Sequence, residues 1–283
     1  MTHSGTRYVL GGQFAPLDAH GTASVWQLSA RYPLVRSGQL SQDFSLVLDF
    51  KTMRDWMLGH ETPASVQALT ATARWSWPAG LNFPAGHSRF ALSDAWVSLI
   101  PGGLRFLSEE AAQDDAAAAQ AAGGFVVVKA GVTGRIALSP RATVLVTATG
   151  QWASKNLYRS EKFALGGPDG VRAYPSGEAS GDLGLLVRSE VRWAPPVTGR
   201  WVQALELSVF VDAGTLTINR RPWTSGNNYR TLAGAGVGVT YAPTAATTLR
   251  VDYAVPLRIE AGGTGGAGPD APGQLWLRLD TRW

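Results

Sequence analysis

Two short motifs, Leu165-Gly166-Gly167-Pro168-Asp169-Gly170-Val171-Arg172-Ala173-Tyr174 and Phe210-Val211-Asp212-Ala213-Gly214, decide how this sequence is interpreted. The first is a glycine-rich loop that carries one arginine, and the second closes a segment of alternating apolar and polar residues. If the loop folds inward, Arg172 can reach the carboxylate of Asp212 inside a lumen, where an unpaired charge is costly and a paired charge is tolerated. The two motifs therefore predict a transmembrane β-barrel whose interior is plugged by a loop.

Alternation of apolar and polar residues recurs along the chain and predicts antiparallel β-strands. In a barrel the apolar side chains of each strand face lipid and the polar ones face the lumen, whereas a soluble sheet reverses this arrangement. We expect an all-β fold of about twelve strands: Thr6–Phe14, Ser24–Leu34, Asp43–Lys51, Ser65–Trp77, Arg89–Ile100, Phe125–Leu138, Thr143–Trp152, Gly184–Trp193, Gln203–Gly214, Leu232–Tyr241, Thr248–Arg258 and Gln274–Trp283.

The composition favours the membrane interpretation. Charged residues make up 16% of the chain, against about 25% in an average soluble domain. The sequence contains 33 glycines and 11 tryptophans, which suit tight turns and interfacial aromatic girdles. We expect Trp75, Trp77, Trp193 and Trp201 to lie in such girdles. A soluble β-sandwich or propeller used for binding is the alternative fold.

Several classes of function are disfavoured. The chain has no cysteine, which excludes thiol catalysis, iron–sulfur clusters and disulfide scaffolds. Its formal net charge of +4 is spread along the chain, so nucleic acid is a poor partner. The four histidines are scattered along the sequence and suggest neither a catalytic nor a metal site. We therefore expect no enzymatic activity, no metal and no cofactor.

The connections between the predicted strands alternate in length. Turns after Leu138 and Tyr241 are short, while the links 153–183, 216–230 and 260–272 are long and rich in glycine or polar residues. Such alternation is typical of a barrel with one periplasmic and one outer rim. Ser108–Ala122 departs from the strand pattern: it is either a helical excursion capped by Ser108 or a solvated, partly disordered insert.

The two motifs resemble those of the haemolysin secretion/activation transporters of two-partner secretion, in the superfamily of outer-membrane assembly and translocation barrels. The resemblance continues in Tyr32–Ser37, Ala233–Gly238 and Leu249–Leu257 and so covers nearly the whole chain. It implies a sixteen-stranded barrel preceded by two periplasmic domains and a plug helix. Residues 1–283 would then be a single outer-membrane barrel domain that begins near the fifth strand, without the periplasmic domains or a signal peptide.

We predict that Arg172 and Asp212, with Phe210 and Gly214 beside the aspartate, lock the loop in the pore. The glycine-rich motif is expected to shape that loop through Gly166, Gly167, Gly170, Val171 and Tyr174. An arginine–carboxylate pair can be bidentate and so fixes position as well as energy. The family usually has glycine where this chain has Ala173, which weakens the expected detail of the loop conformation but not the role of the arginine.

The resemblance implies a translocator in the bacterial outer membrane that exports a large haemolysin- or adhesin-type exoprotein. Its partners would be that exoprotein and outer-membrane lipid, with no nucleotide and no nucleic acid. A barrel-assembly insertase of the same superfamily and a passive porin remain as alternatives. Twelve strands cannot close the sixteen-stranded barrel of the family, so we expect either two unpaired sheet edges or a smaller, strained barrel.

Overall fold

The computed structural model describes residues 1–9, 18–82, 90–196, 205–244, 246–257 and 273–281. Its main feature is one antiparallel sheet whose strands follow the order of the chain: β1 (Thr2–Val9), β2 (His20–Arg36), β3 (Ser41–Met57), β4 (His60–Asn82), β5 (Phe90–Phe106), β6 (Gly123–Ser139), β7 (Ala142–Ala153), β10 (Leu183–Trp193), β11 (Leu205–Thr217), β12 (Tyr229–Thr244), β13 (Thr247–Pro256) and β14 (Gln274–Thr281). The predicted all-β fold is confirmed, and the described residues place twelve strands in this sheet, the number that the sequence predicts.

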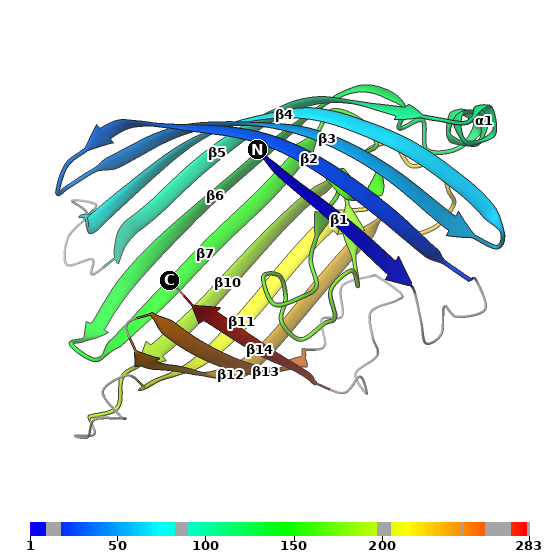
Figure 1. Cartoon of the computed structure of the whole chain (residues 1–283). Helices are drawn as coiled ribbons and strands as arrows, with labels where there is room; N and C mark the ends of the chain where they lie inside the picture. Colours follow the sequence, from blue (N-terminus) through cyan, green and yellow to red (C-terminus); the bar gives the residue numbers. More distant parts are fainter. Residues whose placement is uncertain (10–17, 83–89, 197–204, 245, 258–272, 282–283) are drawn as a thin grey trace.

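The sheet curls round into a barrel-like wall (Figure 1). Its order runs from β1 at one end to β14 at the other, and both end strands lie on the side of the molecule that faces the viewer in Figure 1. Each strand pairs with its neighbours in the chain, so the loop between β7 and β10 leaves the wall without interrupting it. The fold thus provides a curved wall with the long loop inside it.

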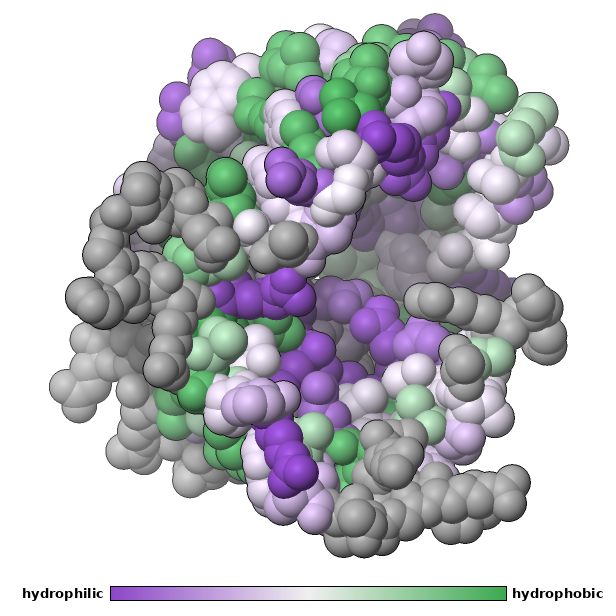
Figure 2. Space-filling model, turned by 90° about the vertical axis from the view of Figure 1, so that its left-hand side faces the viewer, coloured by the Kyte–Doolittle hydropathy of each residue, from purple (hydrophilic) through white to green (hydrophobic). Residues whose placement is uncertain are grey.

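The wall is inside-out, as the alternation predicts. On β11, Val209 and Val211 are 55% and 50% exposed on the outer surface, whereas Phe210 and Asp212 are 3% and 0% exposed. The same outward apolar row recurs on β3, β13 and β14, at Phe44, Leu46, Leu48, Phe50, Tyr253, Val255, Leu275, Leu277 and Leu279. Figure 2 looks onto the rim of the short connections and shows a central hollow lined largely by hydrophilic residues. Such a surface suits hydrocarbon outside and water inside.

Among the connections that lie wholly within the described residues, the predicted alternation holds with one exception. Residues 37–40 and 140–141 make short links on one rim, and residues 107–122, 154–182 and 218–228 make long ones on the other. The exception is the link from β3 to β4 on the rim of the long connections, which consists of Leu58 and Gly59 at φ angles of 53° and 81°. Positive φ at both central residues is the geometry of a tight hairpin turn, so these strands continue to the very edge of the sheet.

The alanine-rich segment forms a helix, α1 (Glu109–Ala117), which confirms the helical alternative. The hydroxyl of Ser108 caps the helix by accepting a hydrogen bond from the amide of Ala111 at 3.3 Å. After the helix, the buried carboxylate of Asp115 accepts from the amides of Ala121 and Ala122, each at 2.9 Å, and turns the chain back onto the wall. No helix in the described part of the chain has the length and apolar character that crossing a membrane requires.

Three of the four girdle tryptophans lie in the described residues. Trp193, at the end of β10, is 42% exposed, and Trp75 and Trp77 are half-buried near the same rim at the end of β4. Trp201, the glycine-rich segment 262–266 and the terminal Trp283 lie outside the described residues.

Residues 154–182 fill part of the interior between the walls. They contain a short 3-10 helix, η2 (Arg159–Glu161), and two short strands, β8 (Phe163–Ala164) and β9 (Ser180–Gly181), which pair with each other. Two buried apolar clusters hold this segment, here called the plug loop. One packs Leu157 against Met53 and Val66 of the wall, and the other packs Leu165 and Tyr174 against residues of β10 to β13.

Candidate functional site

The tip of the plug loop is a compact turn built from the glycine-rich motif. The amide of Val171 donates to the carbonyl of Leu165 at 2.5 Å, and the amide of Gly167 donates to the carbonyl of Tyr174 at 3.0 Å. The amide of Gly170 closes a tighter turn by donating to the carbonyl of Gly167, also at 3.0 Å. These bonds fold the motif back on itself and leave the side chain of Arg172 pointing away from the loop toward the wall.

Glycine is required at three of these positions for steric reasons. A Cβ at Gly170 would collide with the carbonyl oxygen of Leu165, and one at Gly166 would collide with the carbonyl oxygen of Pro175. Gly167 has a φ angle of +106°, which L side chains rarely adopt. On the wall, a Cβ at Gly214 would come within 2.5 Å of Leu165 Cδ2. The predicted loop and wall glycines therefore allow the two segments to approach closely.

Arg172 binds Asp212 through a bidentate pair, as the sequence predicts. Its Nε donates to Oδ2 and its Nη2 donates to Oδ1 of Asp212, each at 2.8 Å. The backbone amide of Arg172 donates to the same Oδ2 at 3.1 Å. The two side chains are each 1% exposed, so the pair lies in a dry environment where charge-assisted hydrogen bonds are strong.

Further groups surround the guanidinium. Nη1 of Arg172 donates to Oε2 of Glu190 on β10 at 2.9 Å. The ring of Phe210 lies beneath the guanidinium, with its centroid 3.3 Å from Cζ, in the geometry of a cation–π contact. Nε1 of Trp276 on β14 donates to the carbonyl oxygen of Arg172 at 2.7 Å. The arginine is thus held by strands from two parts of the sheet.

The residue after the arginine, Ala173, packs its methyl group against the wall. Ala173 is 2% exposed, and a Cβ placed on Gly234 of β12 would collide with its methyl group. The methyl of Ala173 therefore occupies the space that the missing side chain of Gly234 leaves open. The departure from the family pattern is accommodated by glycine on the facing strand.

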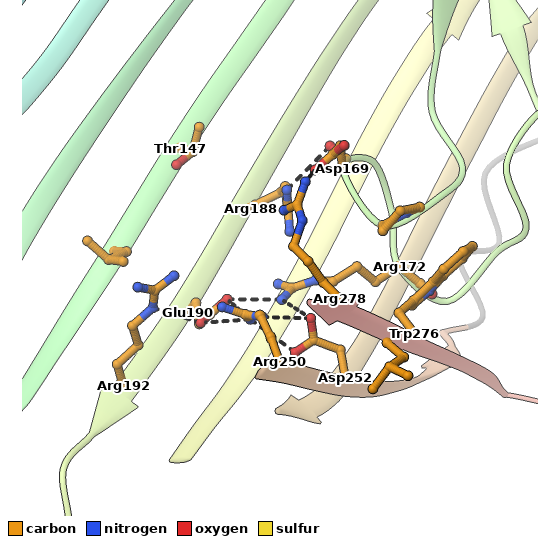
Figure 3. Close-up of a pocket in the computed structure, with 13 residues that line it drawn as sticks. Thr147, Asp169, Arg172, Arg188, Glu190, Arg192, Arg250, Asp252, Trp276 and Arg278 are labelled. Atoms are coloured by element: carbon orange, nitrogen blue, oxygen red, sulfur yellow. Dashed lines mark hydrogen bonds and ion pairs between the residues drawn. The ribbon is translucent and has the colours of Figure 1, made fainter. Parts of the chain in front are cut away.

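A network of charges extends from Arg172 into a cavity of about 350 Å³ beside the loop tip (Figure 3). Arg250 donates to both oxygens of Glu190, at 3.0 and 2.9 Å, and to both oxygens of Asp252, at 2.8 and 3.0 Å. Arg188 lies 3.5 Å from Asp212 and donates to the carbonyl of Asp169 on the loop. Positive and negative groups alternate, which lowers the cost of holding each charge inside the wall.

The electrostatic balance favours the charged arginine. Burial alone would lower the pKa of Arg172, but its hydrogen bonds and its charge interactions with Asp212 and Glu190 raise that pKa above the ordinary value. The guanidinium therefore stays protonated and can serve as a permanent donor to the wall.

The structure brings together all the residues that the sequence singles out, and it adds others. Arg172, Phe210 and Asp212 form the contact, Gly214 lies against Leu165 of the loop, and Val171 and Tyr174 are buried around the contact. Sequence reasoning places Glu190, Asp252 and Trp276 on polar faces of their strands but does not identify them as partners of Arg172. Their role depends on strand register, which pairs Glu190 with Phe210 and Asp252 with Gly238 and Trp276.

An inside-out antiparallel sheet with a charged loop anchored on its inner face defines an outer-membrane β-barrel protein. The family model described as haemolysin secretion/activation protein ShlB/FhaC/HecB matches residues 1–241. The chain belongs to this family, which confirms the resemblance of its motifs.

One curated protein is similar to this chain in sequence, and two solved structures share its fold. The heme/hemopexin transporter protein HuxB of Haemophilus influenzae is 26% identical over 253 residues, which are 88% of this chain and 43% of HuxB. Among solved structures, CdiB from Escherichia coli matches 98% of this chain and 48% of its own, with a TM-score of 0.67 and 16% identity. CdiB from Acinetobacter baumannii matches 99% and 46%, with a TM-score of 0.64 and 17% identity. The chain spans less than half the length of these proteins.

Proposed function

We propose that this chain forms the outer-membrane pore of a two-partner secretion transporter, through which a large haemolysin- or adhesin-type exoprotein leaves the periplasm. The observation that carries the proposal is the buried contact of Arg172 with Asp212, because it holds a long loop inside the wall. The family assignment favours an exporter over a barrel-assembly insertase. The same assignment favours an exporter over a passive porin, because the matching family model is of secretion proteins.

In this role the chain binds no nucleotide, no nucleic acid, no metal and no cofactor, and performs no enzymatic step. Its partners are the exoprotein and the lipid that meets the outward apolar rows. Because the relatives are about twice as long as the chain, we further propose that it is the barrel domain of a longer transporter. Periplasmic domains of that transporter would then recognise the exoprotein.

The charge distribution suggests how the loop and the wall together shape the passage through the barrel. Arg172 is paired with carboxylates on β10 and β11, and the dry contact gives the loop tip a defined place beside the cavity. An extended polypeptide that crosses the barrel must pass the loop or displace it. The pair Arg172–Asp212 would therefore set the shape of the passage.

The test is the variant Arg172→Ala in the full-length transporter. Export of the exoprotein to the medium should fall sharply, while the amount of folded protein in outer-membrane fractions should stay near the wild-type level. Arg31→Ala is the matched control, because Arg31 also faces the interior but pairs with Asp43 on the neighbouring strand at 2.8 Å. Undiminished export by Arg172→Ala, or an equal loss in both variants, would refute the proposed role of the loop.

A further inference from the structure

A second group of charged and phenolic side chains lies at the other end of the plug loop, against β1 and β3. Its centre is Asp55 of β3, which is 7% exposed. The hydroxyl of Tyr158 donates to Oδ2 of Asp55 at 2.5 Å, and the guanidinium of Arg159 pairs with the same carboxylate. The hydroxyl of Tyr8 on β1 donates to the other oxygen, Oδ1, and itself accepts from Arg159 at 2.9 Å.

The inner face of β3 adds two further contacts to the base of the loop. Lys51 donates to the carboxylate of Glu161 at 2.8 Å, and the two side chains are 19% and 9% exposed. Met53, between Lys51 and Asp55 on the same face, belongs to the apolar cluster that contains Leu157. Three successive inward side chains of β3 therefore meet residues 157–161.

These contacts join the plug loop to a part of the wall that is far from β10 and β11 in the sheet order. The plug loop leaves the wall at the end of β7 and returns at β10, whereas β3 lies four places before β7 in the sheet order. The base of the loop thus reaches toward the β1–β3 side of the curved wall, while Arg172 at its tip binds β10 and β11. The loop spans the interior between two separate parts of the wall.

We infer that Asp55 is a second anchor of the plug loop, which positions residues 158–161 on the β1–β3 wall so that two anchors, rather than Arg172 alone, close the resting passage. The inference rests on the proposed function, since closure has a consequence only if the barrel is a conduit. Asp55 acts through the loop and is a positioning residue.

The chemistry of the cluster suits an anchor that releases more readily than the tip. Burial and the hydrogen bond to Asp55 raise the pKa of Tyr158 to about 12, so its hydroxyl remains a donor to the carboxylate. The side chain of Arg159 is 52% exposed, and exposed ion pairs are weaker than dry ones because water screens them. The base is therefore held by several modest contacts and the tip by one strong group.

The test compares Asp55→Asn with Asp43→Asn in the full-length transporter, reconstituted in planar lipid bilayers. Asp43 is the matched control because it lies on the same strand, is equally buried and pairs with Arg31 and Arg36 of β2. We expect a severalfold higher conductance for Asp55→Asn and wild-type conductance for Asp43→Asn. Wild-type conductance for Asp55→Asn, or an equal rise in both variants, would overturn the inference.

A loop-side variant keeps the test decisive if Asp55→Asn does not fold. Tyr158→Phe combined with Arg159→Gln removes two donors from the loop and leaves the wall unchanged, so conductance should rise as for Asp55→Asn. Arg159→Lys keeps the charge and should stay close to wild type. Wild-type conductance of the double variant would overturn the inference. Export of the exoprotein, measured in the same strains, tests the proposed function separately. Conductance tests the second anchor, so the two hypotheses can be rejected independently.

Discussion

The tip and the base of the plug loop are both tied to the wall by a carboxylate, yet they differ in how the carboxylate is used. At the tip, Arg172 alone supplies three hydrogen bonds to Asp212, and both side chains are 1% exposed. At the base, donors from three residues share Asp55, whose side chain is 9% exposed, while that of Arg159 is 52% exposed. Because charge pairs weaken as water enters, the tip supplies most of the holding energy and the base supplies placement.

The largest expected effect separates the two anchors directly. Asp212→Ala leaves the buried guanidinium of Arg172 without its main partner, a loss of about 3–5 kcal/mol for a buried pair, whereas Asp55→Ala should cost clearly less. Limited proteolysis of residues 159–183 in purified protein, with the rate of cleavage as readout, gives the comparison. Faster cleavage in Asp55→Ala than in Asp212→Ala would reverse the assigned roles.

A smaller loss of stability is expected when residue 172 keeps its positive charge but loses the bidentate geometry of the guanidinium. Arg172→Lys retains a cation yet cannot make the bidentate contact with Asp212, so the tip should lose about 1.5–3 kcal/mol, the worth of one hydrogen bond to a charged group. Arg159→Lys at the base should change little, since its contact depends less on planar geometry. Thermal unfolding in detergent measures both. Equal shifts in the two variants would mean that geometry matters no more at the tip than at the base.

Within the loop itself, the steric requirement for glycine should differ by position. Gly170→Ala places a methyl group against the carbonyl of Leu165, while Gly177→Ala meets no atom within 4 Å. Overpacking of this kind costs about 1–3 kcal/mol, so Gly170→Ala should expose the loop to protease. Gly177→Ala, at a φ angle of +84°, should cost only the strain of a positive φ, about 1–2 kcal/mol. Greater cleavage in Gly177→Ala would show that the tip is looser than described.

The smallest effect concerns the ring beneath the guanidinium. Phe210→Leu keeps an apolar side chain but removes the cation–π contact with Arg172, worth about 0.5–2 kcal/mol. Phe50→Leu, on the lipid-facing surface and 47% exposed, is the control for losing a ring. A melting temperature lowered more by Phe50→Leu than by Phe210→Leu would argue against a contribution from the ring to the anchor.

The sequence predicts the tip because its signals are local. The glycine-rich motif is continuous, and Asp212 lies in a strand, β11, whose polar face is evident from alternation alone. Glu190 and Asp252 lie on such faces too, but their meeting with Arg172 depends on register between strands, which alternation does not specify. The predicted strands therefore identify the residues that face the interior but not which of them contact Arg172.

The base escapes prediction for a different reason. The strand predicted at Asp43–Lys51 continues to Met57 in the structure, and over this extension the inside-out rule fails. Met53 faces inward to the apolar cluster under the loop, and Arg54 faces outward beyond the apolar row. Alternation with apolar residues outward is expected only where lipid lies outside the wall and water inside it. The end of β3 is covered by the plug loop on its inner side, so alternation does not predict it.

The most direct test of a buried loop tip is the reactivity of a single thiol in the folded protein. The chain has no cysteine, and Val171, beside Arg172, is 0% exposed, so Val171→Cys introduces one slightly smaller buried side chain. We predict that a hydrophilic maleimide leaves this thiol unmodified, modifies it once Arg172→Ala is added, and readily modifies Ser176→Cys at an exposed loop position. Equal modification of Val171→Cys and Ser176→Cys in the otherwise unchanged protein would contradict the account.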